Sequence, residues 1–413
     1  VIPPCPYRGL SAFTENDANF FFGREAFISQ LLQALDQKHL ITVLGPSGSG
    51  KSSVVFAGLL PRYRTYLKQR ELNLTVVSFR PGIQPCNALA KALASSLTEQ
   101  DAELVETKLL LDLEKSDRAL QTWIEQITHQ PRTRLLLIID QFEEVFTLCS
   151  DCQQRQAFLD NLLQAIYEAT GLRIILTVRS DFLNQLQTYE FNRALQIFPP
   201  ELLGPMNSEE LKAAIIQPAL LEDVRFETWV VERLLAEMKQ PERLPLLEFA
   251  LTELWAKQSD RLIRHQDYQA IGGVEEALVN YAEEVYKQLH ESDRQQTQRV
   301  FTQLVHPGNG AEDTRRLATR TEVGEENWTL VSRLADTRLI ITQYNSLIGE
   351  ETVEVVHEAL IRHWPRLSMW VNRNREFRSW QEQLRTALSQ WIKSGTDKEA
   401  LLGGRFLSVA EGW

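Results

Sequence analysis

The stretch LITVLGPSGSGKSSVVFAGLL, residues 40–60, joins an apolar run to a glycine-rich loop and then to an apolar segment with helical spacing. Its loop, GPSGSGKS at residues 45–52, fits the pattern Gly-x-x-x-x-Gly-Lys-Ser/Thr between a predicted strand and a predicted helix. The glycines let the backbone wrap around a phosphate chain, and the N–H groups at the start of the helix supply positive potential. The stretch therefore predicts a strand, a loop and a helix that together bind a nucleotide.

Within this loop, Lys51 is predicted to reach the β- and γ-phosphates and Ser52 to coordinate Mg²⁺. The expected ligands are ATP or ADP together with Mg²⁺. The other residues predicted to contact the nucleotide here are Gly45, Pro46, Ser47, Gly48, Ser49, Gly50 and Ser53.

A second apolar run ends in Asp140, within LLIIDQFEE at residues 136–144. An aspartate at the tip of a strand, in a chain with such a loop upstream, is predicted to be the second Mg²⁺ ligand. Gln141 occupies the position where many hydrolysing P-loop enzymes carry a water-polarising glutamate. Glu143 and Glu144 follow it, and either is a candidate for orienting the water. The alternative is that both residues begin a solvated helix and that hydrolysis is slow.

Thr177 and Arg179 end the next predicted strand, in ILTVRSDF at residues 175–182. An arginine at this place is a candidate for contact with the γ-phosphate. A salt bridge with Asp181 is the competing interpretation.

Short apolar runs alternate with helical periodicity through the first half of the chain. This alternation predicts an α/β fold, a parallel sheet with helices on both faces, in a nucleotide-binding domain at residues 1–205. The runs are LITVLG (40–45), LTVVSF (74–79), LLLIID (135–140) and RIILTVR (173–179).

The second half of the chain has a different pattern. Residues 206–291 show helical periodicity alone, which predicts an all-α lid domain. Helices followed by the strands RLIITQ and TVEVVH predict a winged-helix domain at residues 292–364. Residues 365–413 keep helical spacing, and we expect this linker to lead to a further C-terminal domain of a longer protein.

Composition narrows the choice of partners and location. The net charge of −11 argues against an anionic membrane surface or a general nucleic-acid coat as partner. No apolar run approaches the ~18 residues of a membrane span, and the N-terminus lacks the features of a signal peptide. The four cysteines contain one CxxC pair, Cys149 and Cys152, which does not complete a zinc site. We expect a cytoplasmic protein.

The segment EVVHEALIRHW, residues 354–364, looks at first like the HExxH helix of a zinc protease. That motif needs histidines four positions apart, on one face of a helix. His357 and His363 are six positions apart and point roughly 240° from each other on a helix, so a zinc site is not predicted.

Six motifs follow one another along the chain, namely FFGRE (21–25), GPSGSGKS, LLIIDQFEE, LTVRSDF (176–182), LPLLEFAL (244–251) and VVHEALIRHWPRL (355–367). Together and in this order they resemble the STAND class of signal-transduction ATPases, which includes apoptosome ATPases and NOD-like receptors. The match is closest to the bacterial novel STAND branch, which is often followed by WD repeats.

The resemblance implies roles for residues outside the loop. Gly23 and Arg24 would flank the adenine, and Pro245 would cover the nucleotide from the helical domain. Arg243 stands where the class commonly has a glycine, two positions before that proline. His357 would touch the β-phosphate of bound ADP.

The resemblance also implies that Arg179 senses the γ-phosphate in a nucleotide-dependent switch. The switch is expected to hydrolyse ATP slowly and to self-associate when active. Flanking parts would supply an N-terminal effector domain and a C-terminal repeat domain that senses an unknown trigger, in bacterial signalling, anti-phage defence or programmed cell death.

Two alternatives remain open. One is a scaffold that binds ATP without turnover. The other is a DNA-binding winged-helix ATPase of the origin-recognition or transcription-regulator type. The predicted recognition helix, ENWTLVSRLADT at residues 326–337, carries Glu326 and Asp336 but only one arginine, so nucleic acid is not an expected partner. DNA binding would draw on a basic cluster of Arg362, Arg366, Arg373, Arg375, Arg378 and Arg385.

Overall fold

The computed structural model divides into two compact units, Val1–Tyr268 and Gln269–Trp413. The division lies inside the helical domain predicted for residues 206–291, and the predicted domain boundaries stay predictions. The described residues are 2–97, 102–128, 132–149, 151–169, 171–188, 191–238, 243–308, 313–337, 339–345, 350–376, 380, 384, 388 and 391.

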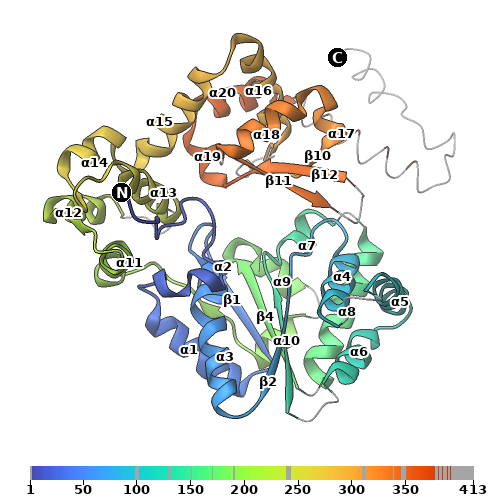
Figure 1. The fold of residues 1–413 in the computed structure, drawn as a ribbon. Coiled ribbons are helices and arrows are strands. Elements are labelled where there is room, and N and C mark those ends of the chain that lie inside the picture. The colour runs from blue at the N-terminus through green and yellow to red at the C-terminus, as the bar shows by residue number, and fades with distance from the viewer. Residues whose placement is uncertain are drawn as a thin grey trace. The chain divides into compact units, whose positions relative to one another are not determined.

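A five-stranded sheet lies at the centre of the first unit, and every neighbouring pair of its strands is parallel (Figure 1). The strand order is β2-β3-β4-β1-β5. The predicted parallel α/β fold is confirmed, while the short fifth strand, in PPELLG, was not predicted. The strands are β1 (Leu40–Gly45), β2 (Asn73–Phe79), β3 (Thr133–Ile139), β4 (Leu172–Arg179) and β5 (Glu201–Leu202).

Helices cover both faces of this sheet, with α1 and α3 on one side and α4, α6 and α8 on the other (Figure 1). The helix that follows the glycine-rich loop is continuous from Lys51 to Gln69 but contains a π-helical stretch, η2 (Val54–Leu59), between α2 (Lys51–Ser53) and α3 (Leu60–Gln69). The remaining elements of this layer are η1 (Glu15–Phe20), α1 (Glu25–Gln37), α4 (Pro85–Leu97), α5 (Ala102–Lys115), α6 (Ala119–Ile127), α7 (Glu144–Thr147), α8 (Cys152–Glu168), η3 (Ser180–Phe182), α9 (Leu183–Thr188) and α10 (Phe191–Ile197).

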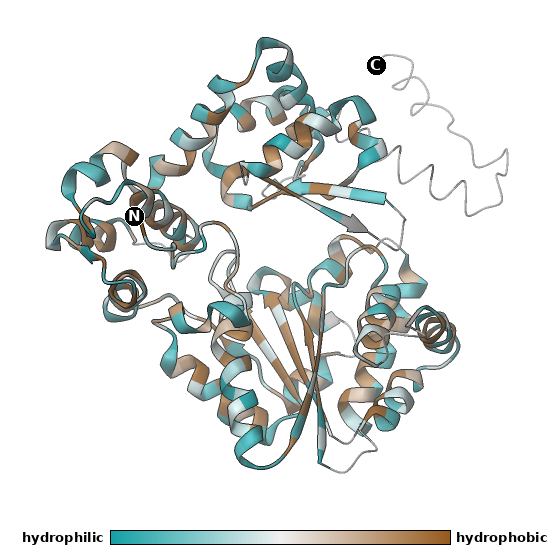
Figure 2. Ribbon diagram, in the orientation of Figure 1, coloured by the Kyte–Doolittle hydropathy of each residue, from teal (hydrophilic) through white to brown (hydrophobic). Residues whose placement is uncertain are grey.

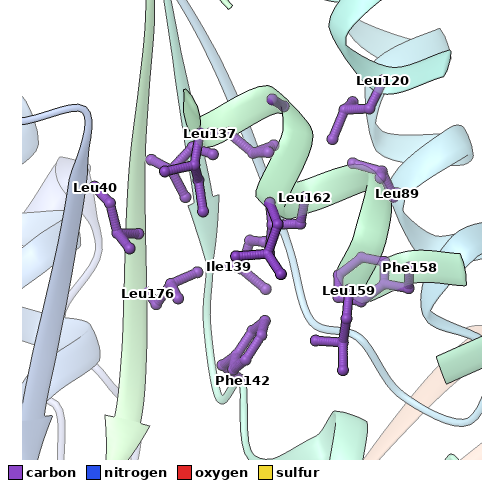
Figure 3. Close-up of a cluster of buried hydrophobic side chains, with 14 of the residues drawn as sticks. Leu40, Leu89, Leu120, Leu137, Ile139, Phe142, Phe158, Leu159, Leu162 and Leu176 are labelled. Atoms are coloured by element: carbon purple, nitrogen blue, oxygen red, sulfur yellow. The ribbon is translucent and has the colours of Figure 1, made fainter. Parts of the chain in front are cut away.

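Most residues of the central strands are apolar, because side chains from alternate positions enter two different cores (Figure 2). In β3, Leu137 and Ile139 join the core under α4, α6 and α8, while Leu136 and Ile138 join the core under α1 and α3. Figure 3 shows the first of these cores, in which Leu162 of α8 packs with strand residues.

Helices also make up most of the rest of the first unit. Asn207 caps α11 with a reciprocal capping box to Glu210, which fixes where this helix begins. The elements are α11 (Ser208–Leu221), α12 (Thr228–Glu237) and α13 (Leu244–Lys257), with a two-stranded parallel pair of β6 (Arg225–Phe226) and β7 (Leu262–Ile263). The boundary between the two units falls within α14 (His265–Ile271).

The second unit combines helices with a three-stranded antiparallel sheet in the order β10-β12-β11. The helices and the strand pair that were predicted here are present, and their assignment to a winged helix stays a prediction. The elements are α15 (Gly273–Gln288), α16 (Glu291–Gln303), β8 (Val305–His306), β9 (Thr314–Arg315), β10 (Ala318–Thr319), α17 (Arg320–Val323), η5 (Glu325–Asn327), α18 (Trp328–Asp336), β11 (Ile340–Asn345), β12 (Glu350–Val355), α19 (Glu358–His363) and α20 (Pro365–Arg373).

The predicted linker at residues 365–413 begins with α20, but most of its residues, including Arg378 and Arg385, lie outside the described residues. Within the part of the chain that is described, no helix combines the length and apolar character that crossing a bilayer requires.

We expect Leu162→Ala to lower the free energy of unfolding by about 2–5 kcal/mol, because the change leaves a cavity in a fully buried core. Leu104→Ala is the matched control, since this side chain is 72% exposed and its loss is expected to change stability by less than about 0.5 kcal/mol. Urea unfolding followed by circular dichroism measures both values. Equal effects of the two substitutions would contradict the two-core description.

Candidate functional site

The glycine-rich loop connects the carboxyl end of β1 to α2, as the sequence predicts. A side chain at Gly45 would place its Cβ 2.8 Å from Ser49 Oγ and 3.1 Å from the Leu203 carbonyl oxygen. The loop therefore closes tightly only because this position is glycine.

Lys51 is largely enclosed by the loop that it follows. Its Nζ donates to the carbonyl oxygens of Gly45 at 2.9 Å and Pro46 at 2.8 Å. Burial lowers the pKa of Lys51, and the nearby charge of Glu143 opposes that shift. The ammonium group thus lies in the loop, at the place where the motif presents it to phosphate oxygens.

Two polar atoms beside the loop are buried without a hydrogen-bond partner, namely Ser49 Oγ and Arg24 Nε. Arg24 is 4% exposed and donates from Nη2 to the Ser49 carbonyl oxygen at 3.4 Å. Buried polar groups are normally paired, so these atoms indicate that the site is built for a further polar group. The oxygens and nitrogens of a nucleotide fit that requirement.

Gly23 fixes the start of α1 against α11. Its φ is +84°, and an added Cβ would come within 2.3 Å of the Glu210 carbonyl oxygen. Because only glycine tolerates this approach, Gly23 lets α11 pack closely beside Arg24.

Asp140 connects three elements of the site, as its hydrogen bonds show. Its Oδ1 accepts from Ser52 Oγ at 2.6 Å and from Thr177 Oγ1 at 2.7 Å, so α2, the end of β3 and β4 meet at one carboxylate. Its Oδ2 lies 3.3 Å from Nε of Arg80, which directly follows β2. The structure therefore brings the two predicted Mg²⁺ ligands, Ser52 and Asp140, together.

These two ligands fit the chemistry of Mg²⁺, which prefers oxygen and usually completes its shell with waters and substrate phosphates. No group of three or more His, Cys, Asp or Glu residues that could hold a metal occurs among the described residues. A hydroxyl and a carboxylate beside a phosphate-binding loop match the way in which this ion is usually held.

Thr177 fixes the sharp turn that follows Asp140. Gln141 adopts a positive φ of 55°, and its N–H donates to Thr177 Oγ1 at 2.9 Å. The Phe142 N–H donates to the Thr177 carbonyl oxygen at 2.9 Å. A single hydroxyl thus orients Asp140 and holds the next residue of the turn.

The two candidate glutamates have different surroundings. Glu143 accepts a hydrogen bond from the Arg179 N–H at 3.3 Å. Burial raises its pKa, against the nearby positive charges of Lys51 and Arg179. Glu144 instead accepts from the Gly82 N–H at 3.0 Å, in the loop between β2 and α4. Glu143 is therefore the carboxylate near the phosphate-binding lysine.

Arg179 lies beside the first residue of the loop, since it pairs with Gly45 in the register of β1 and β4. Its guanidinium makes a two-pronged salt bridge to Asp181, with N···O distances of 3.1 and 2.9 Å. The competing interpretation of this residue is thus observed. Contact with a γ-phosphate would require the guanidinium to turn from Asp181 and stays a prediction.

Pro245 lies in the first turn of α13 and is partly buried. One turn further on, Glu248 accepts from the Arg8 N–H at 3.3 Å, and burial raises the pKa of this carboxyl to about 8. The same N-terminal segment reaches the loop helix, where the Phe13 N–H donates to Ser53 Oγ at 3.1 Å. The segment thus connects α13 to α2, a role that the sequence did not reveal.

His357, in the second unit, caps the N-terminus of α19. Its Nδ1 accepts from the Ala359 N–H at 3.1 Å, so the hydrogen of the neutral ring is on Nε2. Burial, with a smaller effect from the charge of Arg315, lowers the pKa of His357 to about 4. The ring is therefore a neutral hydrogen-bond donor near pH 7. His363 is exposed on the same helix.

A family model described as novel STAND NTPase 1 matches residues 6–399. A search of curated proteins finds no match.

Solved structures with a similar arrangement share little sequence with this chain. The ORC1 protein of Aeropyrum pernix in complex with DNA is 13% identical, with 86% of this chain and 94% of that chain covered and a TM-score of 0.45. The ORC2 protein of the same organism, in ADPNP and ADP complexes, is 12% identical over 87% and 95%, with a TM-score of 0.49. A Walker-type ATPase of Pyrococcus abyssi is 15% identical over 87% and 98%, with a TM-score of 0.41.

We expect Thr177→Val to lower the free energy of unfolding by about 1–3 kcal/mol, because it leaves the Gln141 N–H without its partner and removes one of the hydrogen bonds that Asp140 accepts. Thr42, on the neighbouring β1, is the matched control, because its buried hydroxyl has no hydrogen-bond partner. Thr42→Val should therefore cause no loss. Denaturant unfolding measures both, and a larger loss at Thr42 would refute the assigned role of Thr177.

Proposed function

The chain belongs to the novel STAND NTPase 1 family and is a P-loop ATPase, and from this premise we propose that it is a nucleotide-dependent switch that rests with ADP and is active with ATP. The observation that carries the proposal is the arrangement at one edge of the sheet. There Lys51, Ser52 and Asp140 lie with Glu143 around a loop that has unpaired polar atoms beside it.

The loop would bind the phosphates through its backbone N–H groups and Lys51, whose ammonium would turn from the carbonyl oxygens of Gly45 and Pro46. Arg24 and Ser49 would supply further donors toward the nucleotide. Mg²⁺, held by Ser52 and Asp140, would neutralise charge that develops on the phosphates. Gly23 and Pro245 would position the base, as in the class that the motifs resemble.

Glu143 would accept the proton of the attacking water. It lies near Lys51, whereas the carboxylate of Glu144 is engaged with Gly82 in another loop. Its burial favours a proton acceptor with a raised pKa, which suits base catalysis near neutral pH. The salt bridge to Asp181 would hold the guanidinium of Arg179 until a γ-phosphate competes with Asp181 for it.

His357 would hold the resting state by donating a hydrogen bond from Nε2 to the β-phosphate of ADP. The support is chemical, since the backbone bond to Nδ1 presets the tautomer and the lowered pKa keeps the ring neutral. A nucleotide shifts such a switch only through its different affinity for the two forms. A contact made with ADP alone supplies such a difference.

In the complete protein we propose self-association on activation, an N-terminal effector domain and C-terminal repeats, such as WD repeats, that sense an unknown trigger. We further propose a cytoplasmic location and a role in bacterial signalling or anti-phage defence. These proposals follow from the motif resemblance.

The DNA-binding alternative loses support from the side chains that it would use. Arg366 binds Glu283 through two hydrogen bonds of 2.8 and 2.9 Å. Arg375 binds both oxygens of Asp313 at 2.8 Å. Guanidinium groups held by carboxylates within their own unit are less available to phosphates.

We expect Glu143→Gln to reduce ATP hydrolysis by a factor of about 10² or more while leaving ATP binding intact, because the amide cannot accept the proton. Glu144→Gln is the matched control and should hydrolyse ATP within a few-fold of the unmodified protein. Single-turnover phosphate release measures both rates. Loss at Glu144 with retention at Glu143 would overturn the assignment.

The pH dependence gives a second check on this base. The carboxylate must be ionised to act, and burial raises the pKa of Glu143. Hydrolysis should therefore increase with pH through a pKa above that of an ordinary glutamate, and this acidic limb should vanish from the residual rate of Glu143→Gln. A limb that persists in the variant would identify a different base.

We expect His357→Asn to accelerate ADP release by about ten- to a hundredfold, the effect of losing one hydrogen bond to a charged group. Asparagine still caps the helix, so this change separates the phosphate contact from the cap on α19. His363→Ala is the control and should release ADP at the original rate. Stopped-flow release of a fluorescent ADP analogue measures the rate for the unmodified protein and for both variants. Unchanged release from His357→Asn would exclude the contact.

A further inference from the structure

Arg80 is the one charged partner of Asp140 that the hydrogen bonds of the described residues show, and it belongs to none of the sequence motifs. It directly follows β2 in the sequence RPGIQ, and its Nε lies 3.3 Å from Asp140 Oδ2. The carboxylate is 6% exposed, whereas the arginine side chain is 44% exposed. The ion pair therefore joins a buried carboxylate to a guanidinium group on a partly exposed side chain.

The two oxygens of Asp140 have different partners. Oδ1 accepts from the neutral hydroxyls of Ser52 and Thr177, which fix the carboxylate in its orientation. Oδ2 is bound by the guanidinium of Arg80. Positive charge therefore already lies on the carboxylate that the proposed function assigns to a divalent cation.

We propose that Arg80 is the counter-ion of Asp140 in the metal-free site and that it sets the Mg²⁺ concentration at which the site loads. This inference rests on the proposed nucleotide and metal site. Two cations on one carboxylate repel each other, so binding of the divalent ion requires the guanidinium to withdraw. If closure of the ion pair has an equilibrium constant K, the apparent Mg²⁺ affinity is lower by the factor 1 + K.

The local backbone allows this withdrawal without unfolding the loop. The Gly82 N–H donates to Glu144 Oε2 at 3.0 Å, so the loop that carries Arg80 has a second attachment to the segment after β3. The guanidinium is at the end of a long, partly exposed side chain that can turn toward water. Arg80 is thus a positioning residue, and it leaves the carboxylate as the metal arrives.

The experiment measures binding of fluorescent ADP to the full chain as Mg²⁺ is added from zero. Arg80→Gln should lower the half-saturating Mg²⁺ concentration by about two- to fivefold, the range that a partly exposed ion pair supplies. In the absence of Mg²⁺ it should weaken ADP binding, because Asp140 then faces the phosphates without its counter-ion. Arg80→Lys should restore part of both effects.

Arg132→Gln is the matched control, since it removes another arginine that pairs with a carboxylate, Glu71, on an exposed part of the first unit. It should leave both measurements unchanged. Arg80→Ala repeats the test with a second side chain, and thermal melting verifies that each variant is folded. Manganese binding followed by electron paramagnetic resonance gives the metal affinity without any turnover.

An unchanged or raised half-saturating Mg²⁺ concentration in folded Arg80→Gln and Arg80→Ala overturns the inference, and a raised value indicates that Arg80 binds the phosphates instead. If the unmodified protein binds no nucleotide at any Mg²⁺ concentration, the proposed function itself fails. The two failures are therefore distinguishable.

Discussion

The carboxylate of Asp140 is the interaction on which the candidate site depends. It receives Ser52 from the loop helix and Thr177 from β4, two groups that lie far apart in the sequence. This meeting requires β4 to lie between β1 and β3, so that three carboxyl ends reach the same edge of the sheet. The order of the strands therefore determines that Ser52, Asp140 and Thr177 lie together.

The order of the strands is in turn held by a sheet that is buried on both faces. Each central strand contributes alternate side chains to two cores, and a shift of one residue would exchange the side chains that enter them. The same burial makes most positions of the central strands apolar. For this reason the sequence predicts β1 to β4 well, whereas β5, with two residues and prolines before it, gives no such pattern.

The candidate site divides in the same way between what pattern reveals and what needs coordinates. Lys51, Ser52 and Asp140 are evident because each belongs to a local motif with a fixed place at the end of a strand. Glu143 and Glu144 are neighbours in sequence, and only the turn after β3 decides which one faces Lys51. Arg80 belongs to no recognisable motif, although it directly follows β2 as Asp140 directly follows β3. Its only sequence signal is that it is a charged residue at the carboxyl end of a predicted strand.

The π-helical stretch Val54–Leu59 changes what the loop helix can transmit. A π-bulge corresponds to a one-residue insertion into an α-helix, and it rotates all later residues by about 100° relative to those before it. The segment from the phosphate loop to Gln69 thus consists of two α-helical parts separated by the π-helical stretch. This stretch packs at Gly58 against Ile28 of α1. Deleting one residue from this stretch would restore a regular helix and turn the buried face of α3 away from the sheet. The apolar face of α3 therefore points toward the sheet only because the π-helical stretch lies between it and the phosphate loop. A homologue with one residue fewer in this stretch would need its apolar residues at different positions of α3.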